Sequence, residues 1–254
     1  MKITGRLIKS VITTRQTSSN FFGEENPYEN LYETLAQSLP PENAIGGGDF
    51  QQIGKMLLSV LIDSGLKPNH SLFDLGCGTG RLSIQAIEYL ENAKYYGSDI
   101  SETMLMHARN LTSHLGKTPR FIHQTEPNFT TFPTFDFICA FSVFTHMEPE
   151  DTFNYLKSAL AMSNKNTKFV LSVIPLGSTL GLNIFTNSAS LTLKERWQRV
   201  RNAPTTLDFF EEMAKLAGWK IVSTYDGETE SIPIMNSNSF GQLGQTVIVL
   251  VPVS

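Results

Sequence analysis

The sequence predicts a doubly wound α/β fold, in which helices cover both faces of a mainly parallel, seven-stranded sheet. Between residues 71 and 174, short apolar segments alternate with longer segments of helical periodicity. The short segments are apolar throughout, as expected of parallel strands that are buried on both faces. A glycine-rich turn over residues 76–80 joins the first of these strands to a helix.

Residues 1–45 precede this alternation and are polar and rich in turn-forming residues. Asn26-Pro27 and Pro40-Pro41 are helix breakers. Between them, apolar and aromatic residues recur at helical spacing: Tyr28, Leu31, Tyr32 and Leu35. This spacing predicts a short amphipathic helix that packs on the main domain; the alternative is that Tyr28 or Tyr32 closes over a ligand. We therefore divide the chain into an N-terminal helical or lid segment, residues 1–45, and a main domain, residues 46–254.

The main domain opens with a glycine hinge and a helix. Asp49 is a suitable N-cap for this helix, and Gly65 and Pro68 end it. Its apolar stripe consists of Phe50, Ile53, Leu57, Val60 and Leu61. The first strand, residues 71–74, then leads into the glycine turn, and the next helix starts at Leu82.

Four more strands are expected before residue 175, with helices on the connections. They span residues 94–99, 120–124, 135–142 and 168–174. Ser101 is a good N-cap for the helix that follows the second strand. Glu148, Glu150 and Asp151 occupy the start of the helix after the fourth strand, where acidic residues interact favourably with the helix dipole.

The alternation is interrupted after residue 174. Residues 175–204 contain turn residues and a basic run, and we expect this insertion to cover the mouth of the substrate site. A capping sequence at Thr206 then starts a helix whose inward-facing residues are predicted to be Leu207, Phe210, Met213 and Ala217. Strands over residues 219–224 and 245–251 complete the seven.

Composition excludes several functional classes. The 254 residues carry a net charge of −4 with a pI of about 5.8, which argues against a nucleic-acid partner. The two cysteines, Cys77 and Cys139, lie in apolar segments, so a disulfide framework is excluded. No stretch has the length of a membrane span, and residues 1–14 lack the continuous apolar region of a secretory signal. We therefore expect a cytoplasmic protein.

The glycine turn has the sequence Asp74-Leu-Gly-Cys-Gly-Thr-Gly80. Glycines allow positive φ and a close approach of the backbone to a ligand, and the following helix offers N–H groups to an anion. A dinucleotide fingerprint would require G-x-G-x-x-G, which places Arg81 at the third glycine. The spacing found is G-x-G-x-G, preceded by an acid, and it resembles motif I of the class I S-adenosylmethionine-dependent methyltransferases.

The resemblance covers residues 50–174 and implies a Rossmann-like methyltransferase fold that binds S-adenosyl-L-methionine. It places the methionine part of the cofactor among Asp74, Gly76, Cys77, Gly78 and Gly80. It assigns the ribose hydroxyls to Asp99 at the end of the second strand, and the adenine to Ile100 and Met104. Many members have an acid after strand three, and Glu126 is the candidate here. Phe141, after strand four, is expected to lie against the cofactor.

His146 is the candidate catalytic residue. It follows strand four, and its ordinary pKa near 6.5 suits removal of a proton from an acceptor at neutral pH. The alternatives are that His146 only shapes the loop, or that nearby Glu148 acts instead. The remaining histidines are scattered along the chain, so no metal site is expected: His70, His107, His114 and His123.

The sequence therefore predicts an S-adenosylmethionine-dependent methyltransferase that acts on a small-molecule or glycan-like acceptor, at oxygen or nitrogen. Two other interpretations stay open. A nicotinamide-dependent oxidoreductase also uses a glycine turn and an acid at the position of Asp99. A non-catalytic partner subunit would bind S-adenosylmethionine without turnover. The oligomeric state is not predicted.

Overall fold

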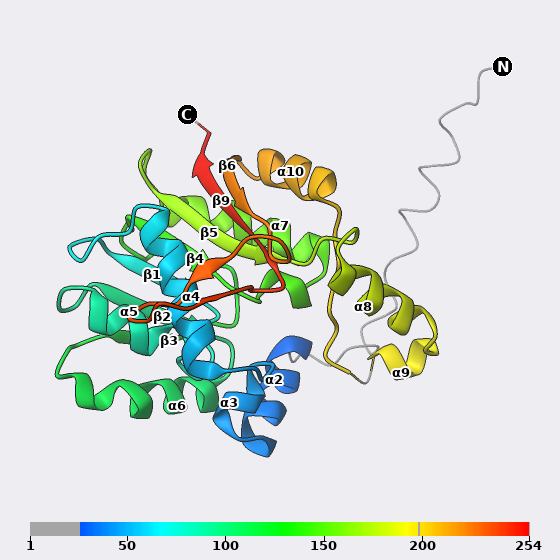
Figure 1. Ribbon diagram of the computed structural model, residues 1–254, viewed down its shortest axis with the longest axis horizontal. Helices are drawn as coiled ribbons and strands as arrows, with labels where there is room; N and C mark the ends of the chain where they lie inside the picture. The colour runs from blue at the N-terminus through cyan, green and yellow to red at the C-terminus, as the bar shows by residue number, and fades with distance from the viewer. Residues whose placement is uncertain (1–25, 198, 254) are drawn as a thin grey trace.

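The computed structural model describes residues 26–197 and 199–253. A seven-stranded sheet with the order β3-β2-β1-β4-β5-β9-β6 runs through the molecule, and helices flank it (Figure 1). β1 to β5 are parallel to one another, whereas β9 is antiparallel to both β5 and β6. The sheet is formed by β1 Leu72–Leu75, β2 Tyr95–Asp99, β3 Arg120–His123, β4 Phe137–Ala140, β5 Lys168–Val173, β6 Trp219–Tyr225 and β9 Thr246–Pro252. The predicted fold class is confirmed.

Two apolar cores lie on opposite faces of the sheet, because successive strand residues point to opposite sides. Phe73 of β1 belongs to the core that includes helices α7 (Pro149–Ala159) and α10 (Leu207–Leu216). Its neighbour Leu72 belongs to the core that includes α4 (Phe50–Asp63) and α5 (Ser83–Tyr89). Helix α6 (Glu102–Thr112) packs on β2, β3 and α5.

The helix N-caps that the sequence predicts are confirmed. Asp49 accepts a hydrogen bond from the Gln52 N–H (2.9 Å), and Ser101 accepts one from the Met104 N–H (3.1 Å). Thr206 caps α10 by accepting from the Phe209 N–H at 3.3 Å. These contacts fix where α4, α6 and α10 begin, and therefore where the strand-to-helix turns lie.

Three features differ from the sequence prediction. The 175–204 insertion contains two helices, α8 (Thr179–Ala189) and α9 (Leu193–Trp197). The connection before the last strand contains a small hairpin of β7 (Ile232–Pro233) and β8 (Phe240–Gly241). Leu207, predicted to face inward, is 40% exposed. It is the first residue of α10, and side chains point toward a helix N-terminus, so no preceding turn of the helix covers Leu207.

The N-terminal part of the described chain lies beside α6 at one end of the molecule (Figure 1). It forms α2 (Pro27–Ser38) and the short α3 (Pro41–Ala44), which confirms the predicted helix. Residues 1–25 of the predicted lid segment lie outside the described residues. Short 3-10 helices occur at η1 Ser113–Leu115, η2 Phe144–His146 and η3 Leu160–Met162.

No helix among the described residues has the length and apolar character needed to cross a membrane. Cys77 and Cys139 are both free and buried. The described residues thus agree with the disulfide-free core that the sequence predicts.

Candidate functional site

A cavity of about 680 Å³ lies where β1, β2, β4 and β5 end. Its volume is within the range of about 300–1,000 Å³ that small-molecule sites occupy, and ligands of open α/β sheets bind at this edge. The sequence-predicted residues that line it are Asp74, Gly76, Cys77, Gly78, Asp99, Ile100, Met104, Phe141 and His146. The fold therefore brings residues from motifs 70 positions apart in the chain into one site.

Two sequence-predicted residues lie outside the cavity lining. Gly80 faces α6, where a Cβ at this position would lie 3.2 Å from the Ala108 Cα, so its role is helix packing. Glu126 is not in the lining either, and Gln124 lines the cavity in its place. The Gln124 N–H donates to the Asp99 carbonyl at 3.0 Å, which holds Gln124 at the sheet edge before the chain turns away.

The backbone N–H groups of the glycine turn form hydrogen bonds within the protein, mostly to residues of β2. The N–H groups of Gly76 and Cys77 donate to the Ser98 carbonyl, at 2.8 and 2.9 Å. The Gly78 N–H donates to Asp99 Oδ2 at 2.8 Å, and the Gly80 N–H donates to the Cys77 carbonyl. These four N–H groups are therefore not free to bind an anion. A dinucleotide needs such N–H groups for its pyrophosphate, so the nicotinamide interpretation loses support.

Neighbouring side chains explain why this turn needs glycine. Gly78 has a φ of +56°, and a Cβ here would lie 2.7 Å from Ile45 Cγ2. At Gly76, with a φ of +71°, a Cβ would overlap the Val143 side chain. Arg81 follows the turn and donates from its guanidinium to the carbonyls of Ile45 (3.2 Å) and Gly47 (3.0 Å). These two hydrogen bonds hold the segment before α4 against the glycine turn.

Asp99 links the glycine turn to α6. Its Oδ2 accepts from the Gly78 N–H, and its Oδ1 accepts from the Ser101 N–H at 3.0 Å. Burial raises the pKa of Asp99, and these backbone hydrogen bonds oppose that rise. Each carboxylate oxygen can accept more than one hydrogen bond, so Asp99 retains acceptor capacity toward hydroxyl groups in the cavity.

Asp74 is more deeply buried. The Tyr95 hydroxyl donates to its Oδ2 at 2.6 Å, and the Cys139 thiol lies 3.4 Å from its Oδ1. Burial raises the pKa of Asp74 to about 7, against the effect of these two hydrogen bonds, and the nearby charge of Asp99 adds to the rise. Two acidic groups thus lie on the cavity wall, and a positively charged ligand would favour the ionised form of both.

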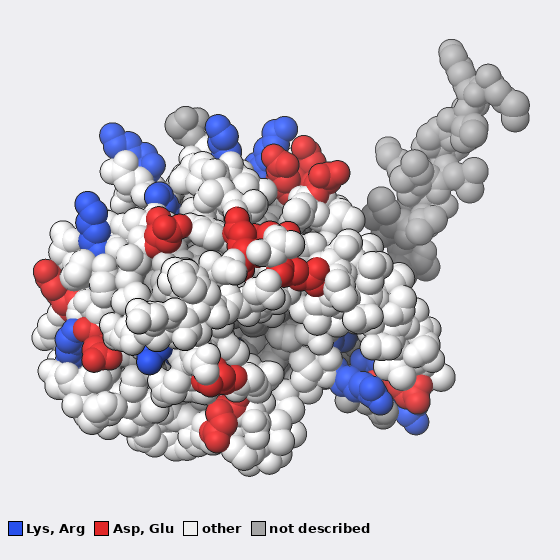
Figure 2. All heavy atoms as spheres, viewed as in Figure 1, with Lys and Arg blue, Asp and Glu red and all other residues white. Residues whose placement is uncertain are grey.

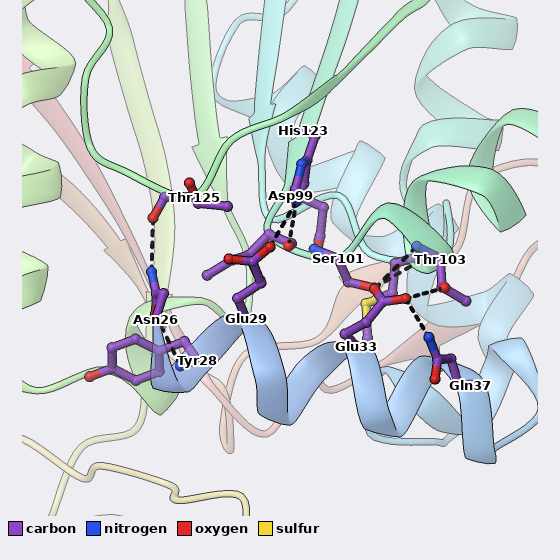
Figure 3. A network of polar contacts seen from close by, with 12 residues as sticks. Asn26, Tyr28, Glu29, Glu33, Gln37, Asp99, Ser101, Thr103, His123 and Thr125 are labelled. Atoms are coloured by element: carbon purple, nitrogen blue, oxygen red, sulfur yellow. Dashed lines mark hydrogen bonds and ion pairs between the residues drawn. The ribbon is translucent and has the colours of Figure 1, made fainter. Parts of the chain in front are cut away.

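Helix α2 is fastened across the sheet edge by polar contacts along its length (Figure 3). The Glu33 carboxylate accepts from the Ser101 hydroxyl at 2.6 Å and from both the hydroxyl and the N–H of Thr103. Although partial burial acts the other way, these hydrogen bonds lower the pKa of Glu33 to about 2. At the start of α2, Asn26 donates to the Thr125 carbonyl at 3.0 Å, and Glu29 lies 3.6 Å from His123.

Both tyrosines of α2 line the cavity. The Tyr28 hydroxyl donates to Asp151 at 2.7 Å and accepts from the Glu148 N–H at 3.1 Å, at the start of α7. The Tyr32 ring meets the His146 ring edge-on, with centroids 6.1 Å apart. The helix therefore packs on the main domain, as the sequence predicts, and also covers the cavity.

Two hydroxyl groups in the cavity wall have no hydrogen-bond partner within the described residues. They are the Tyr32 hydroxyl and the Ser98 hydroxyl, and both oxygens are buried. Buried polar groups are normally paired, so these two indicate a polar ligand. A nucleoside with hydroxyl and amino groups fits this wall, and it fits the acceptor capacity of Asp99.

Ser142, Ser172 and Gln245 form a cluster that sequence reasoning missed. Ser142 has a φ of +57°, and its N–H donates to the Ser172 hydroxyl at 2.8 Å. The hydroxyls of Ser142 and Ser172 both donate to Gln245 Oε1, at 3.1 and 2.7 Å. Because its oxygen is held in this way, Gln245 presents its NH₂ group as a donor at the cavity. Non-glycine residues with positive φ are concentrated at functional sites.

His146 is fixed by a backbone contact. Its Nδ1 lies 2.7 Å from the Arg201 carbonyl, which can only accept, so Nδ1 carries the proton and Nε2 has the lone pair. Burial lowers the pKa of His146, so the ring is neutral at pH 7. Glu148, the alternative base, forms an ion pair with Arg201 and is not in the cavity lining. The geometry therefore favours His146.

Comparisons with known proteins identify a domain within the chain and structures with a similar fold. A family model described as a methyltransferase domain matches residues 73–169. The magnesium protoporphyrin IX methyltransferase from Synechocystis PCC 6803 with bound SAH is similar in fold, with 18% identity, a TM-score of 0.62, and coverage of 90% of this chain and 100% of that chain. An S-adenosylmethionine-dependent methyltransferase from Clostridium acetobutylicum ATCC 824 has 15% identity, a TM-score of 0.58, and coverage of 90% and 99%. The CcbJ methyltransferase from Streptomyces caelestis has 14% identity, a TM-score of 0.58, and coverage of 92% and 100%.

The matched segment contains Gly76, Cys77 and Gly78 of the glycine turn together with Asp99, Phe141 and His146, and all six line the cavity. The similarity to the Synechocystis structure extends over the whole fold, with a TM-score of 0.62 and coverage of 90% of this chain. Residues 73–169 therefore carry a methyltransferase domain, the whole chain has the fold of known methyltransferases, and these findings together support an S-adenosylmethionine-dependent methyltransferase of class I.

Proposed function

We propose that this enzyme methylates a hydroxyl oxygen of a small acceptor with an apolar body, and that His146 removes the hydroxyl proton. The observation that carries the proposal is the hydrogen bond between His146 Nδ1 and the Arg201 carbonyl. It leaves the basic Nε2 without a partner among the described residues, in a side chain that lines the cavity. A neutral imidazole in this tautomer is ready to accept a proton.

S-adenosylmethionine, when bound, supplies an activated methyl group. The chain itself must hold the acceptor in line with that group, keep water out and take up the acceptor proton. Helix α2 covers the cavity through Tyr28 and Tyr32, which accounts for the exclusion of water. His146 is the group that takes up the proton from the acceptor hydroxyl.

Gln245 accounts for positioning of the acceptor. Gln245 immediately precedes β9, which is antiparallel to β5 and therefore begins at the cavity edge. We propose that the NH₂ group of Gln245 donates to an oxygen of the acceptor. Two serine hydroxyls hold the amide in one orientation, so little side-chain entropy remains to be lost on binding.

The character of the acceptor follows from the remaining wall. Apolar and aromatic side chains dominate it: Leu35, Leu39, Met147, Tyr155, Val200 and Leu243. This wall suits a ring system or an aliphatic chain better than a glycan, which would require many polar partners. The solved structures with a similar fold include an enzyme for magnesium protoporphyrin IX, but that acceptor belongs to that protein.

The proposal is tested by offering the enzyme S-adenosylmethionine with an isotope-labelled methyl group and matched pairs of acceptors. Each pair has the same apolar body and carries either a hydroxyl or an amine. Mass spectrometry is expected to find the label on the hydroxyl compounds. Label found only on the amines, or only on carbohydrate acceptors, would contradict the proposal.

A further inference from the structure

Helix α8 has an exposed apolar face that the fold leaves uncovered. None of its eleven described residues is charged, and of these only Gly181 is buried. Leu182 is 50% exposed and Phe185 is 54% exposed. Leu182, Phe185 and Ala189 follow one another at intervals of three and four residues, so they lie along one side of the helix.

The attachment of α8 explains this exposure. Its first turn is held by Glu228, whose carboxylate accepts from the N–H groups of Thr179 (3.1 Å) and Leu180 (3.0 Å). A Cβ at Gly181 would overlap the Pro175 carbonyl, so the helix crosses the backbone closely at this point. Beyond it, α8 and α9 project from the body of the molecule (Figure 1).

A basic cluster adjoins this apolar face. Residues 179–201 contain four basic residues and one acidic residue, which is a net charge of +3. The net charge of the whole chain is −4, so the remaining residues together have a net charge of −7. The one acid, Glu195, accepts hydrogen bonds from Thr192 at the start of α9. Figure 2 shows basic side chains gathered where Figure 1 places α9. Lys194 and Arg199 are exposed.

We propose that α8 and α9 form an interfacial anchor that binds the surface of an anionic membrane. Leu182 and Phe185 would enter the headgroup region, and Lys194 and Arg199 would lie against the anionic lipids. An eleven-residue helix is about 16 Å long. The apolar area that such a short helix exposes is small compared with the roughly 1,000 Å² that a stable protein interface buries. Shallow insertion into a bilayer, in contrast, needs only a few apolar side chains.

The anchor lies next to the cavity. Val200 and Asn202, which follow α9, line the cavity, and Leu180 approaches Gly244, the neighbour of Gln245. An acceptor dissolved in the membrane would therefore enter the cavity beside the bilayer. This last step rests on the proposed function, whereas membrane binding does not depend on it.

The test is flotation of the full chain with vesicles. The wild type is expected to float with vesicles of phosphatidylcholine and phosphatidylglycerol at low salt, and to stay in solution with phosphatidylcholine alone or at high salt. Lys194→Glu with Arg199→Glu should lower the partition coefficient at least roughly tenfold. Leu182→Glu with Phe185→Glu should abolish flotation.

The matched control is Leu216→Glu, because Leu216 is 78% exposed on α10, outside the anchor. This variant should float like the wild type, and circular dichroism should show the same fold for all variants. Absence of flotation by the wild type, or undiminished flotation by the Leu182→Glu Phe185→Glu variant, overturns the proposal. So does a dimer in sedimentation velocity that becomes monomeric in that variant, because the face would then join two copies. Flotation requires no methyl transfer, so its failure is distinguishable from failure of the proposed function.

Discussion

At the scale of single residues, the site depends on side chains whose hydrogen bonds leave one functional group free. The Arg201 carbonyl occupies Nδ1 of His146, and the hydroxyls of Ser142 and Ser172 occupy the oxygen of Gln245. In each case the opposite nitrogen has no partner among the described residues. These contacts are the physical basis for assigning a base and a donor.

Replacement of His146 tests the assigned base. His146→Ala should lower turnover by about 10²–10⁴, while the affinity for S-adenosylhomocysteine stays near that of the wild type. Burial lowers the pKa of His146 below 6.5, so the neutral base is present at pH 7 and is lost only as pH falls through that lowered value. The acid limb of the wild-type pH–rate profile should therefore disappear in the variant. His114→Ala, on an exposed surface, is the control.

Two replacements of Gln245 distinguish hydrogen-bond donation to the acceptor from structural support of Ser142 and Ser172. Gln245→Leu should lower kcat/KM for the acceptor by roughly three- to tenfold, the value of one neutral hydrogen bond. Gln245→Glu keeps two oxygens to accept from Ser142 and Ser172 but cannot donate, so it should be at least as impaired. Near-normal activity of Gln245→Glu would mean that Gln245 only supports the two serines.

The buried Asp74 predicts a pH dependence of stability. Its folded pKa of about 7 lies above the value of about 4 expected when unfolded, so the native state binds the extra proton between these pH values. The Asp74 contribution to the unfolding free energy should fall as pH rises from about 4 to 7, by about 1 kcal/mol per pH unit. Denaturation curves of Asp74→Asn should lack this decline, and curves that change in parallel with the wild type would refute the assignment.

At the scale of elements, α2 is attached by side chains rather than by a large apolar face. Ala36 is its only buried residue of those described, and Glu33 provides the bond to Ser101 and Thr103. The helix was predictable from its periodicity. Its position over the cavity was not, because nothing in the sequence pairs Glu33 with residues 68 and 70 positions later.

Glu33→Ala should therefore loosen α2 without unfolding the sheet. Hydrogen exchange of residues 27–38 should become faster, by a factor that corresponds to roughly 1 kcal/mol for this solvent-facing site. Exchange in β1 and β4 should not change. Glu42→Ala, an exposed acid in α3, is the control, and equal acceleration in both variants would contradict the role of Glu33.

At the scale of the whole molecule, the parallel half of the sheet was predictable because apolar strands, caps and glycine turns recur there in order. The antiparallel last strand was not. Its apolar run, Val247–Val251, is equally consistent with either direction, and direction decides that Gln245 lies at the cavity. The pairing of the N–H groups in the glycine turn was also not predictable, because Gly76 and Cys77 donate to Ser98 of the neighbouring strand β2.

Ligand binding tests the central claim, that the cavity between the glycine turn and α2 is the cofactor site. Calorimetric titration of the wild type should show one S-adenosylhomocysteine bound per chain and no binding of NADH. Asp99→Ala should weaken S-adenosylhomocysteine at least roughly tenfold, since a charge-assisted hydrogen bond contributes about 1.5–3 kcal/mol. Binding of NADH in place of S-adenosylhomocysteine, or unchanged affinity in a folded Asp99→Ala variant, would contradict the account.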